Sequence, residues 1–275
     1  MAVSVSNITP TRNQAAYLEQ TIRSVLTQVW PGLEYVIVDG ASTDGTVEIL
    51  RRYGDRLRWI SEPDRGQADA INKGIRITRG EIVAYLNSDD FYELDAVRRV
   101  VEVFESDPGV DLVYGDCYYQ DDRQGIRKVE RSKPATAEDL LRVGNVIGQP
   151  AAFFRRQALE RAGLFDERYT FALDFDMWVR LLRGGRARHL PVPLATFRVH
   201  AESKTVTQQA RATEELLDIL ARHGGRRWSP LYMRSQLSRL LTLERIHGLS
   251  RTHPQLYRLG KRLLFAMTGV PQRLA

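Results

Sequence analysis

Apolar residues in the first hundred positions follow two alternating patterns. Short apolar runs, each followed by polar or glycine-containing turn residues, predict buried strands at Val3–Ile8, Tyr35–Val38 and Ile82–Leu86. Helical spacing lies between them, first at Leu18, Ile22, Val25, Leu26 and Val29, and then over Thr46–Tyr53, Gln67–Arg76 and Ala96–Phe104. Because strand and helix alternate, we predict an α/β fold with a mainly parallel sheet flanked by helices, with ligands bound beyond the carboxyl ends of the strands.

From residue 110 the strands follow one another more closely. Val110–Tyr114 and Ile126–Glu130 are strand-like and enclose the turn-rich segment Gln120–Gly125. Arg188–His200 is extended and contains two prolines, which are typical of a sheet edge or a bulge. This half of the chain therefore predicts a mixed sheet rather than a purely parallel one.

Beyond Ser203 the leucines recur at helical spacing, which predicts a helical extension over residues 204–275. Its apolar groups are Leu216, Leu217 and Leu220, then Leu237, Leu240, Leu241 and Leu243, then Leu256, Tyr257, Leu263 and Leu264. Residues 224–275 hold ten Lys or Arg and the single acid Glu244, a balance of 10 − 1 = +9, whereas the whole chain carries +6. Such a basic amphipathic extension can pack on the rest of the chain, on a second copy in a homo-oligomer, or on an anionic membrane surface.

The composition is that of an ordinary folded protein. The 275 residues are 43% hydrophobic and 27% charged, and no run approaches the roughly 20 apolar residues of a membrane-spanning helix. The N-terminus lacks a basic region followed by an apolar signal core. Cys117 is the single cysteine, so one chain cannot form a disulfide or a thiolate zinc cluster. We expect a cytoplasmic setting, at the inner face of the plasma membrane if the extension binds lipid.

Two acidic segments follow predicted strands and are the first candidates for chemistry. Asp39 ends the second apolar run, and Asp44 follows in a turn before a predicted helix, where acids also serve as turn and cap residues. The segment 87–90 (Asn-Ser-Asp-Asp) follows the third run and brings two adjacent carboxylates to the same edge of the sheet. A divalent cation with oxygen ligands, Mg²⁺ or Mn²⁺, would relieve their repulsion, and a solvated turn is the alternative.

Seven segments in chain order resemble glycosyltransferase family 2, and the resemblance covers about residues 3–203. The segments are Thr9–Asn13 (TPTRN), Val38–Thr46 (VDGASTDGT), Gly66–Gly74 (GQADAINKG), Asn87–Asp90 (NSDD), Gln149–Pro150 (QP), Leu173–Arg180 (LDFDMWVR) and Arg198–His200 (RVH). The resemblance implies the GT-A nucleotide-diphospho-sugar transferase fold, a Rossmann-like mixed sheet flanked by helices. It also implies a catalytic domain at 1–203, with a nucleotide-sugar half at about 1–115 and an acceptor half at 116–203, before the helical extension at 204–275.

The resemblance places a donor site on the first half. Asp39 would contact the nucleotide base, and an accepting carboxylate suits the N3–H of uracil or thymine, so UDP- or dTDP-sugars are favoured over GDP-sugars. The loop from Thr9 to Thr11 would cradle the nucleoside. Further contacts to ribose, sugar or diphosphate would come from Arg65, Asp69, Lys73, Asn87 and Ser88. An exposed charged helical face would explain the first three of these equally well.

The resemblance also implies the catalytic groups. Asp89 would be the principal metal ligand, and Asn87 stands where many members carry a first acid. His200 would close the metal site, with a loop-capping role as its alternative. Asp174 would be the general base that takes a proton from the acceptor hydroxyl, with a helix N-terminal carboxylate as its alternative. Leu173 replaces an acid that many members carry before the base. A single base and direct displacement imply inversion at the anomeric carbon.

Gln149 and Trp178 are the predicted acceptor contacts. An amide can hydrogen-bond a sugar, and aromatic rings such as Trp178 and the phenylalanine pair 153–154 can pack on one, although core packing is the alternative for all three rings. Asp176 and Arg180 lie four residues apart on the same predicted helix, which predicts a structural ion pair.

Together these features predict an inverting glycosyltransferase that uses Mn²⁺ or Mg²⁺. It would move a hexosyl-type sugar from a nucleotide-diphosphate donor to a hydroxyl of a glycan or lipid-linked acceptor, as in cell-surface polysaccharide synthesis. A sugar nucleotidyltransferase would need the same nucleotide and metal groups, but Asp174 and the acceptor segment argue against it. A non-catalytic nucleotide-sugar or nucleic-acid binding module is the alternative from a different class. Nucleic acid is not an expected partner, because the sequence has no basic patch interleaved with aromatic residues.

Overall fold

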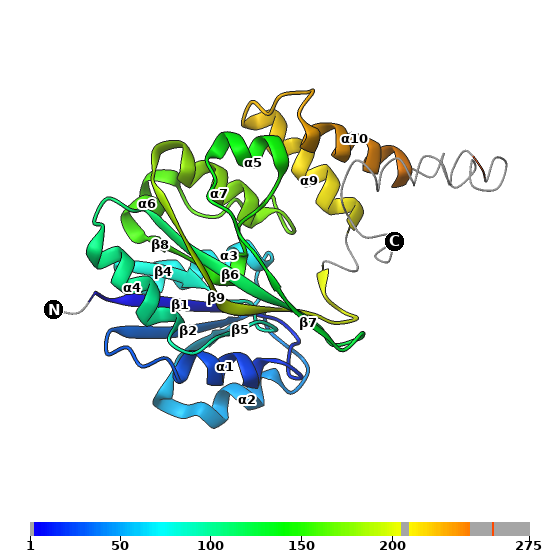
Figure 1. Ribbon diagram of the computed structural model, residues 1–275. Coiled ribbons are helices and arrows are strands. Elements are labelled where there is room, and N and C mark those ends of the chain that lie inside the picture. Colours follow the sequence, from blue (N-terminus) through cyan, green and yellow to red (C-terminus); the bar gives the residue numbers. More distant parts are fainter. Residues whose placement is uncertain (1–2, 205–208, 243–254, 256–275) are drawn as a thin grey trace.

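A nine-stranded mixed sheet forms the middle layer of the molecule, in a computed structural model that describes residues 3–204, 209–242 and 255 (Figure 1). The strand order is β3-β2-β1-β4-β8-β6-β9-β5, and β7 pairs with β6 outside this path. The bounds are β1 Val5–Thr11, β2 Leu33–Asp39, β3 Arg58–Ser61, β4 Ile82–Tyr85, β5 Phe91–Tyr92, β6 Leu112–Asp121, β7 Ile126–Glu130, β8 Ala152–Arg155 and β9 Ala187–Val199.

The first half of the sheet is parallel. β1 lies between β2 and β4, and β3 continues beyond β2 in the same direction. Every residue of β1 and β4 is buried, as expected for parallel strands covered on both faces. The chain passes to one side of β1 through β2 and β3 and to the other side through β4, so the strand order reverses at this point. The carboxyl ends of β1 and β4 therefore flank the place where such sheets bind ligands.

The second half of the sheet is mixed, as predicted. β8 runs antiparallel to both β4 and β6, whereas β9 runs parallel to β6 and carries β5 antiparallel at the edge. The β6–β9 ladder shifts register between Gly115, which pairs with Leu190, and Asp116, which pairs with Pro193. The prolines of β9 thus lie at an irregularity of the ladder, where a missing N–H is tolerated.

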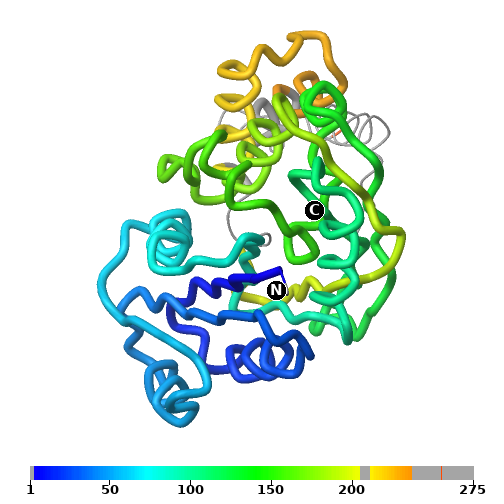
Figure 2. Tube along the Cα trace, turned by 90° about the vertical axis from the view of Figure 1, so that its left-hand side faces the viewer, coloured from blue at the N-terminus to red at the C-terminus, as the bar shows by residue number. Residues whose placement is uncertain are grey.

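Helices cover both faces of the sheet. On one face α1 Leu18–Leu26, α2 Thr46–Tyr53 and α4 Ala96–Ser106 share a core with Val5 and Ile37. The opposite core contains Ile8 and Val36, so successive residues of a strand enter different cores. That core is covered by α3 Gln67–Ile77, α5 Ala137–Val143, α6 Arg156–Ala162, α7 Leu173–Gly184, α9 Gln209–Arg222 and α10 Pro230–Thr242. Figures 1 and 2 show α9 and α10 at the end of the molecule opposite α1 and α2.

The strands and helices expected before residue 200 are confirmed, with one error in a helix face. Val29 is 85% exposed because α1 ends at Leu26. We did not anticipate β3, β5, β8, α5 and α6, which are two to seven residues long and too short to show a clear period. Leu243 and the last apolar group, residues 256–264, lie outside the described residues. Within the described part of the chain, no helix is long and apolar enough to cross a membrane.

The first helix of the extension packs on the rest of the chain. Ile219 and Leu220 of α9 have no exposed surface and join the same apolar core as Phe154 of β8 and Trp178 of α7. Leu231 of α10 enters this core as well. Packing on the chain itself, one of the three alternatives for the extension, therefore applies to α9 and to the start of α10.

Candidate active site

A cleft of about 400 Å³ opens beyond the carboxyl ends of β1 and β4. Its wall brings together residues that are distant in sequence, from the loop after β1 to the segment after β9. Of the predicted site residues it includes Thr11, Asn87, Ser88, Asp89 and His200. The other predicted site residues do not line this cleft within the described part of the chain. They are Thr9, Asp39, Arg65, Asp69, Lys73, Gln149, Asp174 and Trp178.

The loop after β1 carries two buried oxygens that suit a ligand. Thr11 Oγ1 and Gln14 Oε1 are buried at the cleft, and neither has a hydrogen-bond partner among the described residues. Leaving a buried polar atom unpaired is unfavourable unless a ligand or water completes it. Thr9 is different, because its hydroxyl lies 3.1 Å from the hydroxyl of Tyr35 in the core. The predicted cradle therefore uses Thr11, and the predicted donor contact of Thr9 is not supported.

Asp39 lies at the end of β2, directly beside Thr11 in the parallel ladder. Its carboxylate is buried and accepts hydrogen bonds from the backbone N–H of Ser42 at 3.0 Å, from the Ser61 hydroxyl at 2.6 Å and from the Ser42 hydroxyl. Asp44 accepts from the backbone N–H of Thr46 at 3.0 Å, a structural role at the start of α2. The contact of Asp39 with a base stays a prediction.

Arg65, Asp69 and Lys73 form ion pairs at the start of α3. Arg65 lies 3.1 Å from Asp69 and 2.7 Å from Glu167, and Lys73 lies 2.8 Å from Glu62 and 3.6 Å from Asp69. These charges already have protein partners, but only Arg65 is exposed, whereas Asp69 is buried, so the exposed charged face does not describe all three. Their contact with the donor stays a prediction.

A chain of amides joins the donor side of the cleft to the acceptor side. Asn87 accepts from Gln67 Nε2 at 2.6 Å and donates to Gln149 Oε1 at 3.0 Å, and Gln149 donates to the carbonyl of Tyr85 at 2.8 Å. At the other end Lys204 Nζ donates to Gln67 Oε1 at 2.6 Å. The uncharged Asn87, which replaces an acid, is thus the link between the two predicted substrate sides.

The two adjacent carboxylates after β4 have different environments. Asp90 is fully buried and accepts from the backbone N–H of Arg198 at 2.9 Å. Burial and, after it, the neighbouring Asp89 charge raise the pKa of Asp90 well above its ordinary value. Asp89 instead lies on the cleft wall, 3.1 Å from Nε2 of His200, whose ring stacks on Tyr17 with centroids 4.1 Å apart.

Asp89 and His200 could hold a divalent cation together. Among the described residues no three His, Cys, Asp or Glu side chains gather at one point, so these two would be the protein ligands available here. Mg²⁺ in nucleotide sites is commonly held by one or two carboxylates, with phosphate oxygens and waters completing the shell. A carboxylate oxygen and an imidazole nitrogen that lie 3.1 Å apart on the cleft wall would suit a cation whose shell a donor diphosphate completes.

Asp174 is the second residue of α7 and is half-buried. It accepts from the backbone N–H of Phe175 at 2.8 Å and from the Asn145 amide at 3.0 Å. Desolvation nevertheless raises the pKa of Asp174 to about 6. Burial and then the Asp174 charge raise the pKa of Tyr85, the residue whose carbonyl contacts Gln149. The pKa of Asp174 therefore lies above the ordinary value of an aspartate, and its charge acts on the side chain of Tyr85 in β4.

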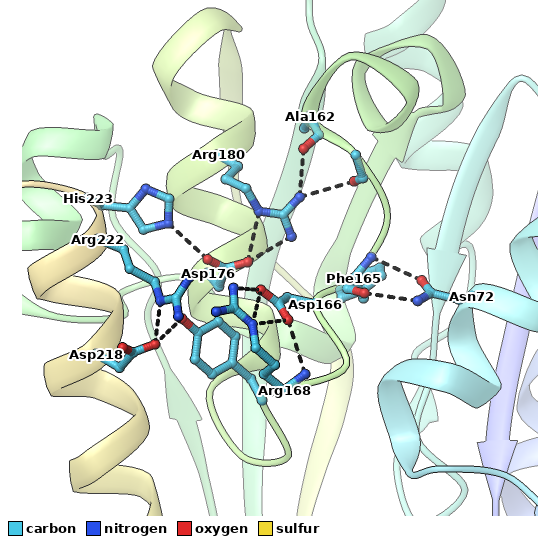
Figure 3. A network of polar contacts seen from close by, with 12 residues as sticks. Asn72, Ala162, Phe165, Asp166, Arg168, Asp176, Arg180, Asp218, Arg222 and His223 are labelled. Atoms are coloured by element: carbon cyan, nitrogen blue, oxygen red, sulfur yellow. Dashed lines mark hydrogen bonds and ion pairs between the residues drawn. The ribbon is translucent and has the colours of Figure 1, made fainter.

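Two further predictions concern α7, the ion pair of Asp176 with Arg180 and the acceptor contact of Trp178. The Asp176–Arg180 pair is confirmed at 2.7 Å, and Nε2 of His223 also lies 2.9 Å from Asp176 (Figure 3). Trp178 has no exposed surface and packs with its ring centroid 6.1 Å from that of Phe154. The predicted acceptor contact of Trp178 is therefore corrected to a core role, because the whole side chain is enclosed in the apolar core that contains Phe154.

Several residues of the cleft wall were not predicted, among them Arg12, Gln67 and Lys204. Arg12 and Gln67 lie within the segments quoted above, so their position in those segments could have identified them. Lys204 follows His200 in an exposed turn, and no local pattern marks it.

The chain is similar to known glycosyltransferases. The model of the family described as glycosyl transferase family 2 matches residues 6–163. A PGL/p-HBAD biosynthesis glycosyltransferase of Mycobacterium tuberculosis is 33% identical over 183 residues, covering 64% of this chain and 68% of that protein. Chondroitin synthase of Escherichia coli is 28% identical over 205 residues, covering 74% of this chain and 30% of that larger protein.

Solved structures show the same fold at low sequence identity. TarS 1–349 of S. aureus in complex with UDP-GlcNAc superimposes with a TM-score of 0.67 at 17% identity, covering 99% of this chain and 83% of that one. The mannosyltransferase PcManGT of Pyrobaculum calidifontis in complex with GDP-Man and Mn²⁺ superimposes with a TM-score of 0.64 at 22% identity, covering 96% and 84%. Both are GT-A type transferases, so the predicted fold class is confirmed.

Proposed function

Because this chain belongs to glycosyl transferase family 2 and is a nucleotide-sugar-dependent glycosyltransferase, we propose that it transfers a sugar with inversion to a hydroxyl of a glycan or lipid-linked acceptor. The observation that carries the proposal is the pairing of Asp89 with His200 on the cleft wall, together with a carboxylate of raised pKa, Asp174, whose charge acts on Tyr85 of the strand that Asp89 follows. The Asp89–His200 pair would hold a cation bound to the diphosphate, and Asp174 would accept the proton of the acceptor hydroxyl. A metal-assisted direct displacement needs both functions.

The chemistry follows from these positions. Asp174 would take the proton of the acceptor hydroxyl while the hydroxyl oxygen attacks the anomeric carbon. The bond from that carbon to the diphosphate oxygen would break on the opposite face, and its electron pair would leave with the nucleoside diphosphate. A divalent cation held by Asp89 and His200 would neutralise the charge that develops on the diphosphate. A single displacement inverts the anomeric carbon.

The proposed donor is a UDP- or dTDP-sugar. Asp39 places an accepting carboxylate beside Thr11, whose hydroxyl has no partner within the described part of the chain. The pair would suit a pyrimidine nucleoside whose N3–H donates a hydrogen bond. The related TarS structures hold UDP or UDP-GlcNAc, and PcManGT holds GDP-Man, so the GDP-sugars are the competing class.

A donor and metal panel tests the function. Purified full-length chain is incubated with UDP-, dTDP- and GDP-sugars, with Mn²⁺ or Mg²⁺, and nucleoside diphosphate release is measured for wild type and Asp174→Asn. The proposal expects release from a pyrimidine donor that requires the metal and Asp174. Pyrophosphate release from a nucleoside triphosphate and a sugar phosphate would instead identify a nucleotidyltransferase. Donor binding with no turnover in any condition would identify a binding module.

An anionic membrane surface is the proposed location of the acceptor. The turn between α9 and α10 contains Trp228, which is 85% exposed, directly after the exposed Arg226 and Arg227. An exposed tryptophan beside arginines is typical of membrane interfaces. Co-sedimentation with phosphatidylserine vesicles should fall in Trp228→Ala. Leu94→Ala, which removes another side chain that is 80% exposed, is the matched control and should bind like wild type. Equal binding of all three proteins would contradict the proposal.

A further inference from the structure

A carboxylate from α9 holds the backbone that leads into α7. Glu215 accepts hydrogen bonds from the N–H of Thr170 at 2.9 and 3.1 Å, of Phe171 at 2.8 Å and of Ala172 at 2.9 Å. The side chain is buried, and Arg211 of the same helix pairs with it at 3.0 Å. Three consecutive N–H groups therefore converge on one charged acceptor, and such charge-assisted bonds are among the stronger hydrogen bonds in proteins.

The start of α7 cannot supply this acceptor itself. The N–H groups of residues 170–172 lie at and before the N-cap of α7, so no carbonyl within the helix can accept a hydrogen bond from them. In this chain the N-cap residue is Ala172, whose methyl group cannot accept a hydrogen bond. Asp174 already accepts from Phe175. The anchoring acceptor consequently comes from a helix far along the chain.

We propose that Glu215 is a positioning residue for Asp174, because it fixes the backbone from which this carboxylate projects. The inference rests on the proposed role of Asp174 as the base. Asp174 lies two residues after Ala172, so movement of the anchored segment displaces it directly. The same carboxylate holds Thr170, which lies on the cleft wall.

Contacts on either side of Glu215 hold α9 against α7 and the loop before it. One turn after Glu215, Asp218 accepts from the Tyr169 hydroxyl at 2.7 Å and from Arg222 at 2.6 Å. At the end of the helix His223 reaches Asp176 of α7 at 2.9 Å (Figure 3). The helix is thus attached to the loop before α7 and to α7 itself, so Glu215 has little freedom to move away.

The charge of Glu215 also acts on the base. Burial raises the pKa of Asp174, the Phe175 N–H and the Asn145 amide lower it, and Glu215 raises it further. Glu215 interacts with two cations, which are Arg211 on α9 and Lys204 at the cleft. Asp174 also interacts with the side chain of Tyr85 of β4. Removing the charge of Glu215 should therefore lower the pKa of Asp174 and move the acid limb of the pH–rate profile to lower pH.

Glu215→Gln and Asp218→Asn form a matched pair of tests. Both keep the size of an α9 side chain and remove its charge, but only Glu215 holds the start of α7. For Glu215→Gln we expect kcat about tenfold lower, an acid limb at lower pH, faster hydrogen exchange of the amides at 170–172 and an unchanged Kd for UDP. Asp218→Asn should lower the Tm without moving the acid limb.

Arg211→Gln provides a second test that does not depend on a buried substitution. The Arg211 side chain is 57% exposed, so this variant should fold, and without the compensating cation the acid limb should move to higher pH. The inference would be overturned if Glu215→Gln kept the wild-type kcat and the wild-type hydrogen exchange at 170–172. Equal shifts of the acid limb in Glu215→Gln and Asp218→Asn would also overturn it. So would an acid limb that does not move to higher pH in Arg211→Gln. Full activity in Asp174→Asn would instead refute the proposed base, while the exchange of residues 170–172 would still test the anchoring.

Discussion

The two sides of the candidate active site are built in different ways. On the donor side, Thr11 ends β1, Asp39 ends β2 and Asp89 follows β4, so the parallel sheet alone brings them to one edge. On the acceptor side, Asp174 starts a helix whose leading backbone is anchored by Glu215 of α9. The three proposed donor groups are therefore placed by strand pairing within the sheet, whereas the proposed base is placed by a side chain from a helix that packs on the sheet. The two sides should respond separately to mutation.

Asp174→Asn should separate the two sides most sharply. Loss of the base should lower transfer about 10³-fold while the Kd for UDP stays unchanged. The Tm should not fall at pH 7, because the raised folded pKa of Asp174 means that its ionisation opposes folding above its unfolded pKa of about 3.9. Single-turnover rates, UDP titration and thermal melts check these outcomes. Weaker UDP binding would show that the sides are not independent.

Asp89→Asn should affect the donor side instead. Loss of one of two protein ligands should weaken Mn²⁺ binding in the presence of UDP and lower transfer about 10²-fold. Titration of Mn²⁺ with and without UDP measures the first effect, and rates at saturating Mn²⁺ measure the second. The pH–rate limb should stay where it is in wild type, because Asp174 is intact. Unchanged Mn²⁺ affinity would remove Asp89 from the metal site.

The acid limb of the wild-type pH–rate profile should report on Asp174, the proposed base on the acceptor side. A base must be ionised to accept a proton, so kcat should be constant well above pH 6 and fall about tenfold for each pH unit below it, following the pKa of Asp174 near 6. UDP binding measured over the same pH range should not follow this curve. A limb near pH 4 would mean that the base lies in a more solvated environment.

Thr11→Val should have the smallest effect and stay on the donor side. The lost hydroxyl has no partner among the described residues, so the Tm should hold while the KM for the donor rises about three- to tenfold. Thr9→Val is the control from the same strand. It should lower the free energy of unfolding by about 1 kcal/mol by breaking the contact with Tyr35, with little change in KM. The reverse result would return Thr9 to the donor site.

The difference between the two sides also explains which site residues could be predicted. Asp89 was identifiable because a carboxylate pair directly after an apolar run must emerge at the sheet edge. The acceptor contact of Trp178 is predicted from a segment that resembles a family motif. The spacing of that segment does not show which face of the helix meets the core, and Trp178 is buried there. The role of Glu215 could not be predicted, because no pattern near residue 172 reveals that the N–H groups before α7 are bound by a side chain of another helix.

The sequence by itself determined the alternation of strands and helices, the mixed second half of the sheet and the strand-end carboxylates. These features depend on apolar period and on neighbours within a few residues, so they can be recognised without knowing the fold. Only the tertiary structure decided that Thr11 rather than Thr9 meets the cleft, that Asn87 joins Gln149, and that α9 anchors the start of α7. Those outcomes depend on which faces of distant segments meet, and the amino-acid order does not specify such contacts locally.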